Sequence, residues 1–254
     1  MLILLPPSEG KHRPSSGPAL DLDSLSTSSL NPIRLRLLKA LVRLSAGNPR
    51  RAAEVLGLGP TQAGALEVNA GLWEEPTARA DTIYTGVLYE ALDVTTLDEA
   101  ARDRADSTLA VASALFGIVR PHDHIPAYRL SGTVSLPRLG PVAGVWRPRV
   151  PAVLDELVDG GLLVDLRSGT YTSLGKPSRD LATRTAAVRV LHEHQGTRKV
   201  VSHFNKATKG RIVRALLESG AAPSDVGGLH DTLGELGWTV EREGNRLDVV
   251  VTEI

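Results

Sequence analysis

The strongest constraint on the fold is a long apolar segment that ends in a stiff polar loop. Residues 109–119 are almost wholly apolar, which is typical of a buried element. The loop that follows carries the polar side chains of Arg120, Asp123, Tyr128 and Arg129, among others. Pro121 and Pro126 restrict its backbone. A buried element that delivers charged side chains to a stiff loop is a common way of building a site.

The composition limits the class of protein. The 254 residues can bury a large core, 42% of them are hydrophobic, and no apolar run is long enough to span a membrane. We therefore expect a globular protein with no membrane partner. The sequence holds no cysteine, which excludes disulfide partners and thiol catalysis and is consistent with a cytoplasmic location. Basic and acidic residues balance at 29 each, so any nucleic-acid contact would have to be local.

The order of the apolar segments predicts an α/β fold with some α+β character. We expect one domain over residues 1–254, with a mixed central sheet flanked by helices and a C-terminal β-hairpin. The expected strands are residues 2–5, 162–166, 199–204, 238–242 and 246–251. Residues 82–93 are expected to form a strand that enters a short helix, and residues 178–194 a helix or partly a strand.

Residues 31–72 are predicted to form a helical insertion with a helix-hairpin-helix pattern. Asn48 and Pro49 have the residue types of an N-cap and a first helical position. Gly57 and Gly59 permit a tight turn before a third helix, whose free N–H groups could hold a DNA phosphate. The candidate DNA-binding residues are Arg50, Arg51, Gly57, Gly59 and Thr61. The alternative is that the two glycines separate two helices for packing alone.

Three loops from distant parts of the chain combine basic and hydrogen-bonding side chains. They follow the first strand at Lys11, follow the apolar run at residues 120–129, and open a helix at residues 205–214. Basic side chains together with free N–H groups at a helix start favour an anion. We expect these loops to converge on one cleft that binds an anionic or nucleobase-like ligand. The alternative for each loop is a solvated basic turn.

The cleft hypothesis assigns a role to each candidate residue. The candidate catalytic residues are Lys11, Arg120, Asp123 and Lys206. Asp123 would orient Arg120 or accept a base N–H, and a lysine close to other cations would have a lowered pKa and act as a base. The candidate ligand-binding residues are Ser8, Tyr89, Tyr128, Arg129, Asn205, Lys209 and Arg214.

The segment 113–131 resembles the YaaA family of peroxide stress proteins. Arg120, Pro121 and Asp123 match that family's Arg-Pro-x-Asp, and Pro126, Tyr128 and Arg129 match its Pro-x-Tyr-Arg. Its Phe-x-x-x-x-Lys-Gly-x-x-Ala-Arg is matched by Phe204, Lys209, Gly210 and Arg214. The resemblance implies a protein of the oxidative-stress response that binds DNA through the helix-hairpin-helix element and a basic cleft.

Two histidines keep a second function open. His122 and His124 stand where the family usually has apolar residues, and an imidazole can serve as an acid–base group or an axial haem ligand. The alternative function is an enzyme acting on a nucleobase or another small anionic or planar ligand, one form being a haem-dependent oxidation such as N-hydroxylation. The chain has no haem attachment motif and no ATP or NAD fingerprint, so the cofactor is unknown. We expect no metal site other than these two candidate haem ligands.

Overall fold

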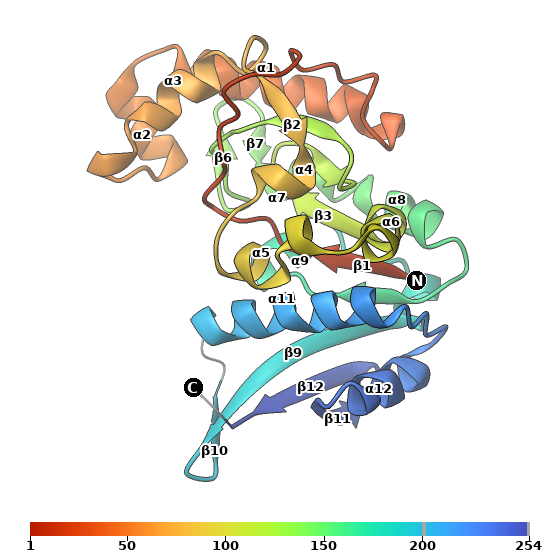
Figure 1. Cartoon of the computed structure of the whole chain (residues 1–254). Helices are drawn as coiled ribbons and strands as arrows, with labels where there is room; N and C mark the ends of the chain where they lie inside the picture. The colour runs from red at the N-terminus through yellow and green to blue at the C-terminus, as the bar shows by residue number, and fades with distance from the viewer. Residues whose placement is uncertain (200–201, 253–254) are drawn as a thin grey trace.

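The molecule is built on a mixed sheet whose middle strands are parallel (Figure 1). In the computed structural model, which describes residues 1–199 and 202–252, the strand order is β11-β12-β9-β8-β1-β3-β4, with β10 attached to β9. The strands are β1 (Leu2–Leu5), β3 (Leu109–Ser113), β4 (Gly117–Val119), β8 (Leu163–Asp165), β9 (Thr185–His194), β10 (Thr197–Lys199), β11 (Thr239–Glu243) and β12 (Arg246–Val251). The expected mixed sheet and C-terminal hairpin are confirmed.

The strand order reverses beside β1. All four residues of β1 are at most 1% exposed, as expected of a parallel strand covered on both faces. β1 pairs in parallel with β3 on one side and with β8 on the other, so the chain crosses from one side of β1 to the other between these strands. The carboxyl ends of β1 and β8 therefore emerge next to each other. In open α/β sheets, this is the place where ligands bind.

Helices cover the sheet, and the longest of them packs closely on its neighbours. α11 (Ser202–Ser219) packs on α5 (Val87–Leu92), α6 (Glu99–Thr108) and β9. At Gly210, α11 and α5 come so close that a methyl group on this residue would collide with the carbonyl oxygen of Leu88. The remaining α-helices are α4 (Ala80–Ile83), α7 (Val142–Trp146), α8 (Val150–Val158), α9 (Gly169–Thr172), α10 (Arg179–Ala182) and α12 (Val226–Glu235). No helix in the described part of the chain is both long and apolar enough to cross a membrane.

Three helices of the subregion 31–72 lie at the end of the molecule opposite the C-terminal hairpin (Figure 1). They are α1 (Asn31–Ser45), α2 (Pro49–Leu56) and α3 (Gly64–Ala70), and a 3-10 turn over Pro60–Gln62 replaces the expected start of the third helix. The predicted cap of α2 is confirmed, since Asn48 Oδ1 accepts a hydrogen bond of 3.1 Å from Arg51 N. One domain over residues 1–254, with 31–72 as a subregion, stays a prediction.

A buried arginine holds α1 against the sheet. Arg34 is fully buried, and its guanidinium donates to the carbonyl oxygens of Phe116, Ile118 and Ser26, each at 2.9 Å. Burial lowers the pKa of Arg34 to about 10, and Asp123 opposes this shift. Because these bonds span the β3–β4 hairpin, they join the helical subregion to the edge of the sheet.

Two strand predictions are wrong. In residues 199–204, β10 ends at Lys199 and α11 has begun by Ser202, while residues 200–201 lie outside the described part. Residues 82–93 contain no strand ahead of the short helix. They hold the end of α4 and all of α5, separated by Gly86 with a φ of 91°. Only an isolated bridge between Tyr84 and Lys11 remains of the expected extended segment. The ambiguous segment 178–194 contains the short helix α10 followed by the strand β9.

Gly210→Ala is expected to lower the free energy of unfolding by about 1–3 kcal/mol, because the added methyl group overpacks the contact between α11 and α5. Urea denaturation followed by circular dichroism measures this change. The matched control is Gly234→Ala in α12, where nothing lies within 4 Å of the new methyl group. There the better helix propensity of alanine should raise stability by up to about 1 kcal/mol. Equal stabilities of the two variants would contradict the packing argument.

Candidate functional site

A cavity of about 740 Å³ opens where the strand order reverses. The loop after β1, the loop after β8 and the first turns of α11 line it with Pro6–Glu9, Leu166–Ser168, Asn205, Lys206 and Lys209. We call it the switch-point cavity. Its described lining includes Lys206 and Lys209, together with Arg167 and Arg189, which have carboxylate partners; the single acid, Glu9, is paired with Arg129. The balance of charge favours an anionic ligand.

Lys209 is the buried amine of the switch-point cavity. Its Nζ donates to Leu166 O at 2.9 Å, at the carboxyl end of β8. Burial lowers the pKa of Lys209 to about 8, and the carboxylate of Asp165 acts against this shift. Lys206, one turn earlier in the helix, is exposed. Together the two lysines bring one buried and one solvated cation to the same wall.

Aromatic side chains stand beside these cations. Tyr89 and Tyr171 line the switch-point cavity, and Tyr89 OH donates to Pro6 O at 2.8 Å. The ring of Tyr89 stacks on that of Tyr84, with centroids 5.4 Å apart. Burial raises the pKa of both Tyr89 and Tyr171, so their hydroxyls are neutral near pH 7. Neutral aromatic walls of this kind suit a planar ligand.

Lys11 lines a second, adjoining cavity of about 410 Å³, which we call the Lys11 cavity. Lys11 Nζ donates to Ser8 O at 2.8 Å and lies 4.1 Å from the ring centroid of Tyr128. Burial and, to a smaller extent, the positive charge of Arg129 lower the pKa of Lys11 to about 7, and Glu9 opposes both effects. Near neutral pH, a large fraction of Lys11 therefore carries a free amine.

An ion pair stands between the two cavities. Arg129 Nη2 lies 2.5 Å from Glu9 Oε2, and Glu9 lines both cavities. The backbone of Arg129 is fixed by Asn69 of α3, whose side-chain amide donates to Arg129 O and accepts from Arg129 N, both at 2.9 Å. Asn69 is fully buried. The helical subregion thus positions Arg129. No sequence signal indicates this role of Asn69, which is a single asparagine within a helix.

A chain of buried hydroxyl groups supports the floor of the Lys11 cavity. Tyr128 OH lies 2.7 Å from Ser113 Oγ, at the carboxyl end of β3, and 3.2 Å from Tyr84 OH. Burial raises the pKa of both tyrosines, which keeps these hydroxyls neutral. Ser8, in turn, accepts a hydrogen bond from Thr85 N at 3.0 Å, which ties the loop after β1 to the segment that carries Tyr84. Sequence analysis did not single out Ser113 or Tyr84 as site residues.

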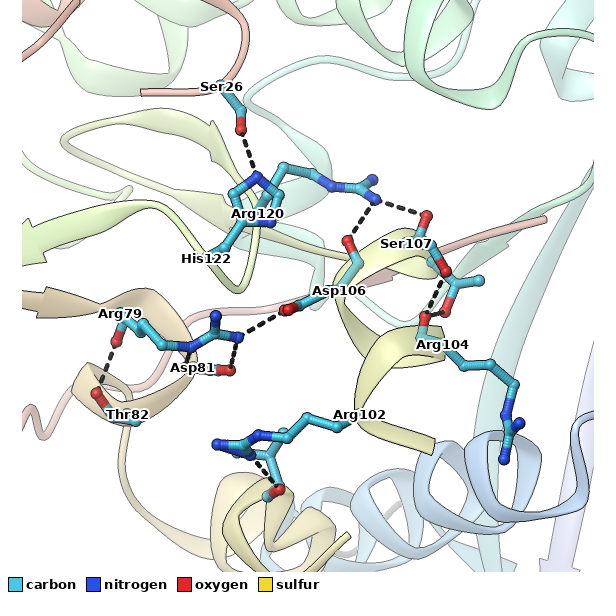
Figure 2. A network of polar contacts seen from close by, with 12 residues as sticks. Ser26, Arg79, Asp81, Thr82, Arg102, Arg104, Asp106, Ser107, Arg120 and His122 are labelled. Atoms are coloured by element: carbon cyan, nitrogen blue, oxygen red, sulfur yellow. Dashed lines mark hydrogen bonds and ion pairs between the residues drawn. The ribbon is translucent and has the colours of Figure 1, made fainter. Parts of the chain in front are cut away.

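The structure does not bring Arg120 and Asp123 to either cavity. Because β4 runs antiparallel to β3, the carboxyl ends of these two strands lie at opposite ends of the sheet. The segment that follows Val119 therefore begins at the end away from Lys11. Figure 2 shows the Arg120 guanidinium at the end of α6, where it donates to Asp106 O and Ser107 O at 3.0 and 2.6 Å. Asp123 accepts from Ser26 N and Arg120 N, both at 2.7 Å. These contacts hold the loop at residues 120–123 against Ser26 and the end of α6.

Arg214 and the two histidines also lie outside the cavities. Arg214 Nη1 donates to the carbonyl oxygens of Leu92 and Asp93 at the end of α5. His122 and His124 are exposed, and His122 Nε2 lies 3.2 Å from Ser26 Oγ (Figure 2). Their positions give the haem hypothesis no support. Within the described residues, no group of three His, Cys, Asp or Glu could hold a metal ion.

The candidate DNA-binding residues spread over two places. Arg50 and Arg51 are exposed at the start of α2, and Gly57 ends that helix with a left-handed φ of 63°. The N–H of Gly59 donates to Gln62 Oε1 at 3.0 Å, so this donor already has a partner. Thr61 lines the Lys11 cavity. The helical subregion therefore reaches the site as well as the solvent.

The fold is that of an open α/β protein with a cation-lined cavity at the switch point of its sheet. By sequence, the chain belongs to the family described as peroxide stress protein YaaA, which matches residues 1–243. The resemblance drawn from segment 113–131 is thereby confirmed.

Relatives from several bacteria support the family assignment. The chain is 49% identical to the UPF0246 protein SCO2297 of Streptomyces coelicolor over the full length of both chains. It is 41% identical to the UPF0246 protein CE1889 of Corynebacterium efficiens, over 97% of each chain. It is also 26% identical to the uncharacterized protein Cj0984 of Campylobacter jejuni, over 84% of this chain and 83% of the relative.

The pKa of Lys11 should respond in opposite directions to changes in its two charged neighbours. Arg129→Gln removes a positive charge and should raise this pKa from about 7, whereas Glu9→Gln removes a negative charge and should lower it. Titration of the Nζ resonance by NMR measures both shifts. Arg147→Gln, at an exposed position away from the two cavities, is the control and should leave the pKa of Lys11 unchanged. A wild-type pKa near 10.5, the ordinary value for a lysine, would refute the assignment.

Proposed function

We propose that this protein binds a small anionic, planar ligand in the switch-point cavity, with its reacting part extending into the adjoining Lys11 cavity, and acts on it by acid–base catalysis with Lys11 as the base. The observation that carries this proposal is the pair of lysines, Lys11 and Lys209, whose pKa values are lowered to about 7 and 8 in adjoining cavities. A base works best when its pKa lies close to the operating pH, and Lys11 meets that condition.

In this proposal, different walls of the cavity bind different parts of the ligand. Lys206 and Lys209 attract the anionic group, and Asn205 adds a hydrogen-bonding side chain to the same wall. Tyr89 and Tyr171 contact the planar part. A proton taken up by Lys11 leaves an ammonium group that Glu9 stabilises, because the Glu9 carboxylate raises the pKa of Lys11.

Membership in a family described for peroxide stress supports a role for this chemistry in the oxidative-stress response. In this proposal the ligand is a metabolite that is formed or damaged under peroxide stress. We further propose a cytoplasmic location, because the chain carries no cysteine.

DNA binding is the second candidate function, and one observation favours it. Arg50 and Arg51 are exposed at the start of α2, and their guanidinium groups make no hydrogen bond or ion pair with any part of the chain that the structure describes. Gly57 supplies the left-handed turn that a helix-hairpin-helix needs between its helices. In this candidate function the turn and the two arginines hold the backbone of a duplex without reading its sequence.

Adenosine monophosphate is a suitable probe for the switch-point cavity, because it combines a planar base with a phosphate. Isothermal titration calorimetry should show one site, and adenosine, which lacks the phosphate, should bind about tenfold or more weakly. Lys209→Met should weaken binding of the nucleotide by a similar factor, and Arg147→Gln should not change it. If neither adenosine monophosphate nor adenosine binds, and mass spectrometry finds no planar compound released from the denatured protein, the ligand proposal is wrong.

DNA binding can be tested separately by fluorescence anisotropy with a labelled duplex. If the second function holds, the affinity should fall steeply between about 50 and 200 mM salt, because bound cations are released on association. Arg50→Gln with Arg51→Gln should reduce both the affinity and the salt slope, while Arg147→Gln with Arg149→Gln, which also removes two exposed arginines, should not. Equal losses in the two double variants would argue against contact through α2.

A further inference from the structure

A third hollow, of about 650 Å³, lies between α1, the start of α2 and the turn that joins β6 (Ser135–Leu136) to β7 (Gly140–Pro141). We call it the basic groove. Its described lining contains five cations and no acid, namely Arg36, Lys39, Arg43, Arg51 and Arg138. Of these, only Arg51 was singled out from the sequence. The groove is separate from the two cavities described above.

The five cations have no partners among the residues that the structure describes. All five are exposed, and none makes a side-chain hydrogen bond or ion pair with any described residue. Several arginines elsewhere in the chain are compensated, as Arg129, Arg167 and Arg189 are by their carboxylate partners. The whole chain has equal numbers of basic and acidic residues, so a general excess of positive charge does not explain the groove. Unpaired cations that repel one another are best explained by an anion that binds among them.

Local structure places these side chains around one hollow. Arg36, Lys39 and Arg43 are spaced by three and four residues and so lie on one face of α1. Arg51 comes from the first turn of α2, which Asn48 caps. Arg138 approaches from the β6–β7 turn. The cations thus come from three separate elements and surround the groove.

The backbone of Arg138 adopts a conformation that is strained for a residue other than glycine. Its φ is 63°, in the left-handed region where glycine is the usual residue. The turn is closed by a hydrogen bond of 3.1 Å from Leu139 N to Leu136 O. An arginine kept at such a position, where glycine would relieve the strain, indicates a role for its side chain.

We propose that the basic groove binds the polyphosphate chain of a small ligand, either an inorganic polyphosphate or a nucleoside triphosphate. Guanidinium groups bind phosphate oxygens through paired hydrogen bonds, and five cations match the charge of a triphosphate. The volume lies in the range of small-molecule sites. Ala40, Leu44 and Leu139 supply apolar lining for the remainder of a nucleotide. The arrangement around one hollow suits a compact chain of phosphates better than the extended backbone of a duplex.

Calorimetry with inorganic tripolyphosphate and with guanosine triphosphate, at physiological ionic strength, tests this proposal. Both probes are titrated into protein that also carries Lys209→Met, because the switch-point cavity would otherwise bind the nucleotide as well. We expect saturable binding at one site, weakened about tenfold or more by Arg43→Gln and by Arg138→Gly. Arg138→Gly is the sharper variant, because glycine suits the left-handed backbone and the melting temperature should stay the same or rise while affinity falls. The double variant Arg147→Gln with Arg149→Gln changes two exposed arginines outside the groove and should bind like the wild type.

Comparing the affinities of the two probes distinguishes the two candidate ligands, inorganic polyphosphate and a nucleoside triphosphate. Equal affinities would assign the groove to inorganic polyphosphate, and tighter binding of the nucleotide would assign it to a nucleoside triphosphate. The proposal is overturned if neither probe saturates, or if the Arg147 and Arg149 double variant loses as much affinity as Arg43→Gln. It is also overturned if a DNA duplex binds through the groove residues and tripolyphosphate does not displace it. None of these outcomes bears on the switch-point cavity, since Lys209→Met leaves the groove intact.

Discussion

The burial of β1 between two parallel neighbours is the constraint on which the rest of the structure depends. Four consecutive apolar residues can be covered on both faces only if other strands flank them and helices pack above and below. The chain meets this demand by placing β3 on one side and β8 on the other (Figure 1). The loop with Ser8, Glu9 and Lys11 must then emerge beside Leu166, and a cavity follows from the topology before any particular ligand is considered.

Burial also sets the chemistry of the site. Lys11 and Lys209 are held by single backbone carbonyl oxygens in surroundings that disfavour a charged amine, and desolvation is the largest cause of the pKa shift in both. Their differences arise from neighbours: Arg129 adds to the shift of Lys11, whereas Asp165 limits that of Lys209. The fold thereby holds two amines whose pKa values are both lowered toward neutral pH, in adjoining cavities.

Local signals in the sequence predicted local structure well. The apolar run of β1, the Asn48 cap and the C-terminal hairpin are each specified by residues adjacent in the chain, and all are confirmed. The loops that leave the parallel strands β1 and β8 line one cavity, whereas Arg120 lies away from it, because the single antiparallel strand β4 carries that residue to the opposite end of the sheet. The contact of Asn69 with Arg129 joins residues 60 positions apart, and no local pattern reports it.

The shared position of Glu9 has a thermodynamic consequence. Glu9 belongs to the walls of both the switch-point cavity and the Lys11 cavity, and its partner Arg129 also influences the proton affinity of Lys11. An anion that drew Arg129 away from Glu9 would leave the carboxylate free to stabilise the ammonium form of Lys11. Ligand association and proton uptake would then be linked functions, each strengthening the other by the same factor. The affinity of such an anion would increase as the pH falls toward the pKa of Lys11, so one ion pair could make occupancy of the cleft sensitive to acidity.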